Sequence, residues 1–132
     1  MAQRLTRLLL DTSVVIAGSP ALMTARGRTA AISVVTLGEL RAGVQLAPNP
    51  TLQSVRQARL LAIRRAFEPI MIDESVAEQY GDILATVRSQ GRTTKATDLL
   101  IIATAAATGR ALVTLDDAQA GLARATGVPV ED

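Results

Sequence analysis

The stretch Leu8-Leu9-Leu10-Asp11-Thr12-Ser13 is the first indication of the fold class. A short apolar run that stops at a polar cluster is typical of a buried strand followed by the start of a helix. The stretch therefore predicts a first strand inside the protein, with a carboxylate at its carboxyl end.

The rest of the chain alternates short apolar runs with helical patterns. Pro48-Asn49-Pro50 ends one helix, Ser75 with Glu78 forms a capping box for another, and Gly109 is a natural helix end. This alternation predicts an α/β fold with a central parallel sheet flanked by helices on both faces. We expect further strands at residues 31–35, 69–73, 111–114 and 127–130, and helices at residues 36–46, 51–66, 75–89 and 98–108.

The composition bounds both the architecture and the chemistry. The chain has 132 residues, 48% of them hydrophobic, which is enough for the core of one domain over residues 1–132. It contains no Cys and no His, which excludes disulfide frameworks, thiolate or imidazole zinc sites, cysteine nucleophiles and serine triads. Aromatic residues make up only 2%, too few for a nucleic-acid surface built on stacking. Any catalysis must come from carboxylates, hydroxyls, Lys or Arg.

The charge balance gives a weak indication of a polyanionic partner. Fourteen Lys and Arg residues face 12 Asp and Glu residues, for a net charge of +2. The apolar stretches are too short or too interrupted to cross a bilayer, and Met1-Ala2-Gln3-Arg4 lacks the hydrophobic region of a signal peptide. We therefore expect a cytoplasmic protein without a membrane association. Four arginines are expected on the outer face of the helix at 51–66, where they need no function: Arg56, Arg59, Arg64 and Arg65.

Four carboxylates are expected at the carboxyl edge of the sheet, where α/β proteins place their functional crevice. Asp11 follows the first strand, and Asp116 follows the strand that ends at Thr114. Asp98 begins the helix that leads to that strand, and Glu39 lies on the helix after the second strand. Carboxylate oxygens and water, without imidazole or thiolate, suit a hard divalent cation such as Mg²⁺ or Mn²⁺. The sequence therefore predicts a site that can orient water at a phosphodiester.

Each acidic residue also has a purely structural interpretation. Asp11 and Asp98 could cap or complement a helix N-terminus, and Glu39 could be an exposed helix residue. Asp116 and Asp117 could form an ordinary turn. The shared placement at one edge favours the functional interpretation, because four coincidences at one place are less expected than one.

Four segments carry these residues in order along the chain. They are Leu9-Leu10-Asp11-Thr12-Ser13-Val14, Ser33-Val34-Val35-Thr36-Leu37-Gly38-Glu39-Leu40 with Gly43 after it, Asp98-Leu99-Leu100-Ile101-Ile102-Ala103-Thr104-Ala105, and Leu112-Val113-Thr114-Leu115-Asp116. Together they resemble the motifs of PIN-domain proteins, and closely those of the VapC toxins of type II toxin–antitoxin pairs. The resemblance covers nearly the whole chain. It implies a PIN fold and a Mg²⁺- or Mn²⁺-dependent endoribonuclease, usually a homodimer, that a VapB-type antitoxin holds inactive.

The resemblance also implies roles for individual residues. Asp11, Glu39 and Asp98 match three acidic positions that hold metal, and Asp116 matches a fourth. We expect Asp11, Asp98 and Asp116 to hold one or two metal ions, with Glu39 acting directly or through water, and all four to be catalytic. Small hydroxyl positions beside the metal are matched by Thr12, Ser13 and Thr114.

The chain departs from the family pattern after the fourth motif. Gln119 and Ala120 stand where the family often has an acidic residue and then Phe, so Asp117 is an alternative to Asp116 for the fourth acidic position. Arg92 and Lys95 lie just before Asp98, and we expect them to contact RNA phosphates; a solvated loop is the other interpretation.

Other α/β families with acidic residues at a sheet edge need residues that this chain lacks. A phosphoacceptor receiver domain would need an acidic pair where the chain has Asp11-Thr12, and a haloacid-dehalogenase-type phosphatase would need a second Asp where Ser13 stands. No glycine-rich phosphate loop is present. The remaining alternative is a non-catalytic PIN-like interaction protein that binds an antitoxin without cleaving RNA, and metal binding distinguishes the two.

Overall fold

The computed structural model describes residues 7–18 and 29–131, and Met1–Arg4, which bear on secretion, lie outside this part. Its strands form one parallel sheet in the order β3-β2-β1-β4, which confirms the predicted sheet. The elements are β1 (Leu8–Leu10), α1 (Thr12–Ala17), β2 (Ala30–Ser33), α3 (Val34–Gln45), α4 (Pro50–Ala66), β3 (Pro69–Ile70), α5 (Glu74–Ser89), α6 (Ala96–Thr108), β4 (Ala111–Val113) and α7 (Asp117–Ala125).

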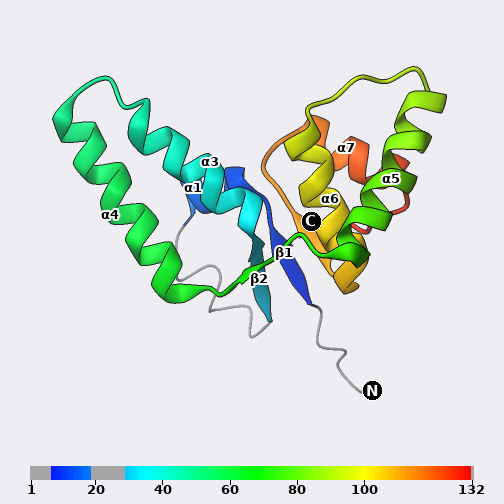
Figure 1. Ribbon diagram of the computed structural model, residues 1–132, viewed down its shortest axis with the longest axis horizontal. Helices are drawn as coiled ribbons and strands as arrows, with labels where there is room; N and C mark the ends of the chain where they lie inside the picture. The colour runs from blue at the N-terminus through cyan, green and yellow to red at the C-terminus, as the bar shows by residue number, and fades with distance from the viewer. Residues whose placement is uncertain (1–6, 19–28, 132) are drawn as a thin grey trace.

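Helices cover both faces of the sheet, as the sequence predicts (Figure 1). On one face, Leu9 and Leu112 pack with buried residues of α5, α6 and α7. On the other face, Leu10 and Ile32 pack with buried residues of α1, α3 and α4. Successive residues of β1 enter different cores because side chains alternate along a strand. The three leucines of β1 are all buried, as expected of an inner strand.

The helix α6 is buried on nearly every side, as its continuous apolar sequence predicts. Ile101, Ile102 and Ala103 are at most 1% exposed, and Gly109 ends the helix in the left-handed conformation (φ 65°). The first turn of α6 carries Asp98, so this deeply packed helix fixes the position of an acidic residue.

The helix α6 begins at Ala96, two residues before the predicted start at Asp98. The starts of α3 and α5 differ from the predicted ones because other side chains cap these helices. Val34 and Val35, predicted to end a strand, begin α3, since Ser33 Oγ accepts a hydrogen bond of 3.1 Å from the backbone N–H of Val35. Before α5, Asp73 Oδ1 accepts a hydrogen bond of 2.9 Å from the N–H of Val76. The predicted capping box of Ser75 and Glu78 is therefore wrong.

The last part of the chain also differs from the prediction. Residues 117–125 form the helix α7, where the sequence pattern indicated only that Asp116 and Asp117 could form a turn. The expected strand at 127–130 is reduced to a single parallel bridge between Val130 and Leu112, on the outer side of β4. None of the helices within residues 7–18 and 29–131 is long and apolar enough to cross a membrane.

Candidate functional site

The carboxyl ends of β1, β2 and β4 meet at one edge because these strands are parallel neighbours. Asp11 directly follows β1, and its backbone N–H donates a hydrogen bond of 2.9 Å to the carbonyl of Val113 at the end of β4. The helix α3, which carries Glu39, begins directly after β2. The topology thus brings three separate segments of the chain to one place, as the sequence predicts.

Asp11 is buried and held in one orientation. Its side chain is 6% exposed. The carboxylate oxygen Oδ2 accepts hydrogen bonds of 2.7 Å from the hydroxyls of Ser13 and Thr114. Asp11 occupies the N-cap position of α1, yet its side chain makes no capping hydrogen bond. Both hydrogen bonds found for this carboxylate within the described residues fall on Oδ2, so Oδ1 is available to a ligand.

The two hydroxyls that orient Asp11 are themselves held by the backbone of the following segment. Ser13 Oγ accepts a hydrogen bond of 3.0 Å from the N–H of Leu115, and Thr114 Oγ1 accepts one of 3.1 Å from the N–H of Asp116. A hydroxyl that accepts from a fixed N–H is left to donate toward the carboxylate. The backbone of 115–116 therefore fixes the direction of both donors.

Glu39 is held by a second group of hydroxyls. Thr12 Oγ1 donates a hydrogen bond of 2.7 Å to Glu39 Oε1, and it shares a hydrogen bond of 3.0 Å with Thr36 Oγ1. Thr36 is fully buried on the first turn of α3 and was not singled out from the sequence. Thr36 lies three residues before Glu39, so the two side chains share one face of the helix. This spacing is the sequence signal that points to Thr36.

Asp98 lies on the first turn of α6 and is partly buried. Burial raises its pKa above the usual value for Asp, and the negative charges of Asp11 and Asp116 raise it further, while Lys95 lowers it. The carboxylates of Asp11, Asp98 and Asp116 therefore share one electrostatic environment. The position of Asp98 fits both the structural and the functional interpretation, because an acidic residue on a first turn also interacts favourably with the helix dipole.

Asp116 is exposed and caps α7. Its Oδ1 accepts hydrogen bonds of 2.9 Å from the N–H of Ala118 and 3.3 Å from the N–H of Gln119. The side chain of Gln119 is buried and donates a hydrogen bond of 3.1 Å to the backbone carbonyl of Asp98. Gln119, where the chain departs from the family pattern, thus ties α7 to α6, which the sequence did not indicate.

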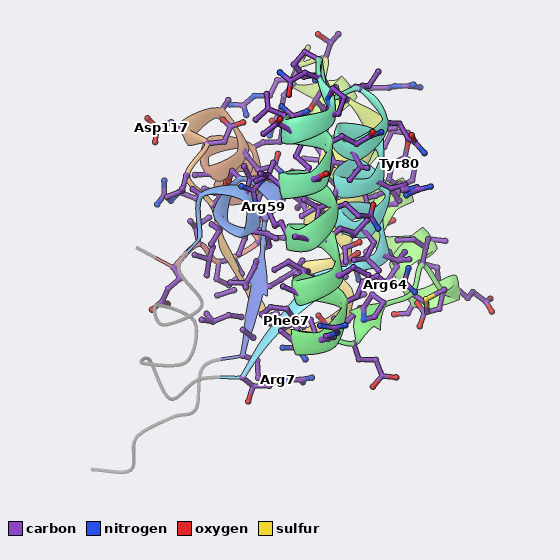
Figure 2. The ribbon with its side chains drawn as sticks, turned by 90° about the vertical axis from the view of Figure 1, so that its left-hand side faces the viewer. Arg7, Arg59, Arg64, Phe67, Tyr80 and Asp117 are labelled. Atoms are coloured by element: carbon purple, nitrogen blue, oxygen red, sulfur yellow. The ribbon has the colours of Figure 1, made fainter. Side chains whose placement is uncertain are left out.

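Asp117 lies apart from the other carboxylates. It is exposed on the first turn of α7 and points away from the body of the protein (Figure 2). It is absent from the charges that raise the pKa of Asp98, whereas Asp116 is among them. The geometry therefore favours Asp116 over Asp117 as the fourth acidic residue.

The two cations predicted to contact RNA are both exposed, in the connection between α5 and α6. Lys95 occupies the N-cap position of α6, and its positive charge lowers the pKa of Asp98. The N–H of Arg92 donates a hydrogen bond of 3.0 Å to the carbonyl of Val87 at the end of α5, which fixes its backbone. Lys95 thus lies beside the acidic edge.

The acidic edge is open rather than closed around an ion. Within the described residues, no three acidic side chains lie close enough together to enclose a metal ion on their own. Mg²⁺ usually keeps several of its waters and takes only one or two carboxylates from the protein. A buried carboxylate with one oxygen available, next to two further carboxylates, fits a hydrated divalent cation.

Comparison with known proteins gives a consistent match. The PIN domain family matches residues 8–125. Ribonuclease VapC5 of Mycobacterium tuberculosis is 33% identical over 131 residues, covering 92% of this chain and 92% of that protein. Ribonuclease VapC8 of the same species is 39% identical over 100 residues, covering 74% and 88%.

Solved structures match over nearly their whole length. The toxin–antitoxin structure VapBC-5 from Mycobacterium tuberculosis has a TM-score of 0.79 with 30% identity, covering 96% of each chain. FitAcB from Neisseria gonorrhoeae has a TM-score of 0.76 with 28% identity, covering 95% of this chain and 96% of that one. The fold, the order of the acidic residues and these matches together place the chain in the PIN-domain family, beside the VapC ribonucleases.

Proposed function

We propose that the protein is a metal-dependent endoribonuclease and the toxin of a type II toxin–antitoxin pair. The observation that carries the proposal is Asp11, a buried carboxylate that two hydroxyls orient at the edge where Asp98 and Asp116 also lie. Burying a charged group is costly, and such groups gather where chemistry needs them. Similarity to proteins named Ribonuclease VapC5 and VapC8 supports RNA as the substrate.

The residues of the acidic edge take separate roles in this proposal. Asp11, Asp98 and Asp116 would hold one or two Mg²⁺ or Mn²⁺ ions, in part through the waters that such an ion keeps, with Glu39 acting directly or through water. When bound, such an ion polarises the phosphate and supplies a nucleophilic water at neutral pH. Ser13 and Thr114 position Asp11, and Thr12 positions Glu39. Asp117 lies next to the site without facing it, and Arg92 and Lys95 contact RNA phosphates.

The partners follow from the same similarity. The matching structures from Mycobacterium tuberculosis and Neisseria gonorrhoeae are VapBC-5 and FitAcB, the first described as a toxin–antitoxin system. We propose that a VapB-type antitoxin binds this chain, that the toxin is a homodimer, and that it acts in the cytoplasm, where its RNA substrates are found. The single domain proposed for residues 1–132 contains the whole site.

The test is cleavage of total bacterial RNA by the purified protein with Mg²⁺ or Mn²⁺. We expect discrete fragments that disappear with EDTA and in the Asp11→Asn and Asp98→Asn variants. Asp82→Asn, an exposed carboxylate on α5, is the matched control and retains cleavage.

A thermal-shift titration with each metal separates the proposal from the non-catalytic alternative. If metal raises the melting temperature and the cleavage assay yields RNA fragments, the nuclease is supported. Intact RNA together with no stabilisation by metal contradicts it and favours a PIN-like protein that only binds its antitoxin.

A further inference from the structure

A cavity of about 280 Å³ lies between α1, α3 and α4 and shares Glu39 with the acidic edge. Its lining residues are Ile16, Glu39, Leu40, Gly43, Arg56 and Arg59. The sequence places Arg56 and Arg59 on an outer helix face without a function, but both are partly buried in the structure. The cavity is therefore a feature that the helical pattern did not indicate.

Arg59 brings a positive charge to this cavity. Within the described residues its guanidinium makes no hydrogen bond or ion pair. Figure 2 shows Arg59 on the side of α4 that faces α1, whereas Arg64, from the same helix, lies on the opposite side. A guanidinium has five N–H donors in a planar fork that matches the oxygens of a phosphate. Arg59 is thus a free donor at the wall of a cavity.

The side chain of Arg56, unlike that of Arg59, is held by a hydrogen bond. Its Nη1 donates a hydrogen bond of 2.8 Å to the carbonyl of Gly43, which ties α4 to α3 across the cavity. Among residues 7–18 and 29–131 this is the one hydrogen bond of the Arg56 side chain, so its other N–H groups can bind a ligand. Two arginines and the single carboxylate of Glu39 therefore line the same cavity, and one oxygen of that carboxylate already accepts a hydrogen bond from Thr12.

The cavity also has an apolar part. Ile16 and Leu40 contribute aliphatic side chains to the lining, and Gly43 contributes no side chain at all. A ligand with an anionic group joined to a less polar ring system matches both parts. A nucleotide has this composition, with its phosphate toward the arginines and its sugar or base toward Ile16 and Leu40.

The cavity is continuous with the acidic edge through a short chain of contacts. Glu39 accepts a hydrogen bond from Thr12, and Thr12 is the neighbour in sequence of Asp11. Glu39 therefore belongs both to the wall of the cavity and to the acidic edge, and a ligand in the cavity lies beside that edge.

We propose that the cavity binds one nucleotide of the RNA beside the cleaved phosphodiester, with Arg59 contacting its phosphate and Arg56 supporting that contact. The inference rests on the proposed function and deepens it, since it assigns substrate-binding residues outside the carboxylate edge. An acidic side chain of a protein partner is the competing occupant, and the experiment below distinguishes it.

The first test compares Arg59→Gln with Arg64→Gln, which removes the same charge from the other side of α4. Binding of a short mixed-sequence single-stranded RNA is measured at several salt concentrations, with Asp11→Asn present in all proteins to prevent cleavage. We expect Arg59→Gln to weaken binding about tenfold, the loss of one charge-assisted hydrogen bond. The slope of log K against log salt should fall by about 0.7, the value for one phosphate contact on a single strand. Arg64→Gln should change neither quantity by as much.

The second test fills the cavity without changing any charge. A side chain at Gly43 meets no atom within 4 Å at its Cβ, so Gly43→Leu should fold and occupy the cavity. Gly38 on the same helix is equally open at its Cβ and does not line the cavity, so Gly38→Leu is the matched control. We expect a higher KM for RNA cleavage with Gly43→Leu and an unchanged KM with Gly38→Leu.

Two results would overturn the inference. One is equal RNA affinity and equal salt dependence for Arg59→Gln and Arg64→Gln, which leaves the cavity to a protein partner or to no ligand. The other is an unchanged KM with Gly43→Leu. Both differ from failure of the proposed function, in which the unmodified protein itself leaves RNA intact.

Discussion

Thr12 donates a hydrogen bond of 2.7 Å to Glu39, although the two residues are 27 positions apart and lie on different helices. This contact joins α1, which follows the central strand, to α3, which follows its neighbour. It holds a carboxylate that could otherwise rotate into solvent. The relationship makes Thr12 a positioning residue with a testable role.

Replacing Thr12 by Val should lower RNA cleavage while the fold is retained, because Val has the same shape but cannot donate to Glu39. Loss of the hydrogen bond leaves one carboxylate oxygen partly buried and unpaired, at a cost of about 1–3 kcal/mol. We expect a fall of about tenfold in kcat with little change in KM. Thr12→Ser keeps the hydroxyl and should restore most of the activity; equal losses in both variants would contradict a role for the hydrogen bond.

Removing either hydroxyl that orients Asp11 should also reduce cleavage. Ser13→Ala and Thr114→Val each delete one of the two 2.7 Å hydrogen bonds to Oδ2. The two hydroxyl oxygens lie only 3.2 Å apart, so the losses should not add in the double variant. A double-mutant cycle on kcat measures this coupling. Strictly additive effects would show that the two residues act independently.

Asp98→Asn should stabilise the metal-free protein at neutral pH. The folded-state pKa of Asp98 lies above its usual value of 3.8, chiefly because of burial, so the folded protein binds the proton more tightly than the unfolded chain does. The associated stability is present below the unfolded-state pKa and is lost as the pH rises through the folded-state pKa. Thermal unfolding of both proteins in EDTA between pH 3 and pH 8 measures the effect. We expect the stability of the variant not to show the loss with rising pH that the ionisation of Asp98 causes in the unmodified protein.

The same variant should be stabilised less by added metal than the unmodified protein. Addition of Mg²⁺ or Mn²⁺ stabilises the form that binds it, so the unmodified protein should gain more thermal stability from the metal than Asp98→Asn does. Asp82→Asn serves as the control for loss of a charge. A variant that gains as much from metal as the unmodified protein would remove Asp98 from the set of metal-binding residues.

Asp116→Asn and Asp117→Asn should separate the two neighbouring acids. Asn is as good an N-cap as Asp, so Asp116→Asn keeps the cap of α7 and loses only the charge. We expect it to lower metal-dependent cleavage without a change in thermal stability, whereas Asp117→Asn, which changes an exposed residue, should cleave normally. Asp116→Ala should additionally destabilise the protein by about 1 kcal/mol through loss of the cap. The reverse ranking of the two Asn variants in a cleavage assay would assign the fourth acidic position to Asp117.

The sequence predicted the parts of the structure that depend on local patterns. The run Leu8–Leu10 indicated β1, the continuous apolar segment after Asp98 indicated the buried α6, and the order of strands and helices indicated the parallel sheet. The parallel arrangement places Asp11 at the carboxyl edge of the sheet. The helix α6 leads back to β4 and begins on that side of the sheet, so its first turn brings Asp98 close enough for the charge of Asp11 to raise its pKa.

The features that the sequence did not predict depend on competition or on distant contacts. Ser75 and Glu78 form a valid capping pattern, but Asp73 lies two residues earlier and caps α5 in their place. The pair Asp116-Asp117 is compatible with either a turn or a helix start. In the structure a helix begins there, and the buried side chain of Gln119 ties this helix to the backbone carbonyl of Asp98. Arg59 appears exposed on a helical projection, and only the packing of α4 beside α3 and α1 forms a cavity around it.

The bond between Asp11 and Thr114 spans 103 positions of the chain. During synthesis Asp11 and Glu39 emerge from the ribosome long before β4 and Thr114 do. A nascent chain interrupted between residues 98 and 111 therefore carries Asp11, Glu39 and Asp98, but it has neither the strand β4 that pairs with β1 nor the Thr114 hydroxyl that helps to orient Asp11. Contacts between distant parts of a chain also slow folding, because the loop between them must first close. A cell that makes such a nuclease is thus exposed to an ordered active site only when synthesis is nearly finished, which leaves time for an inhibitor to be present first.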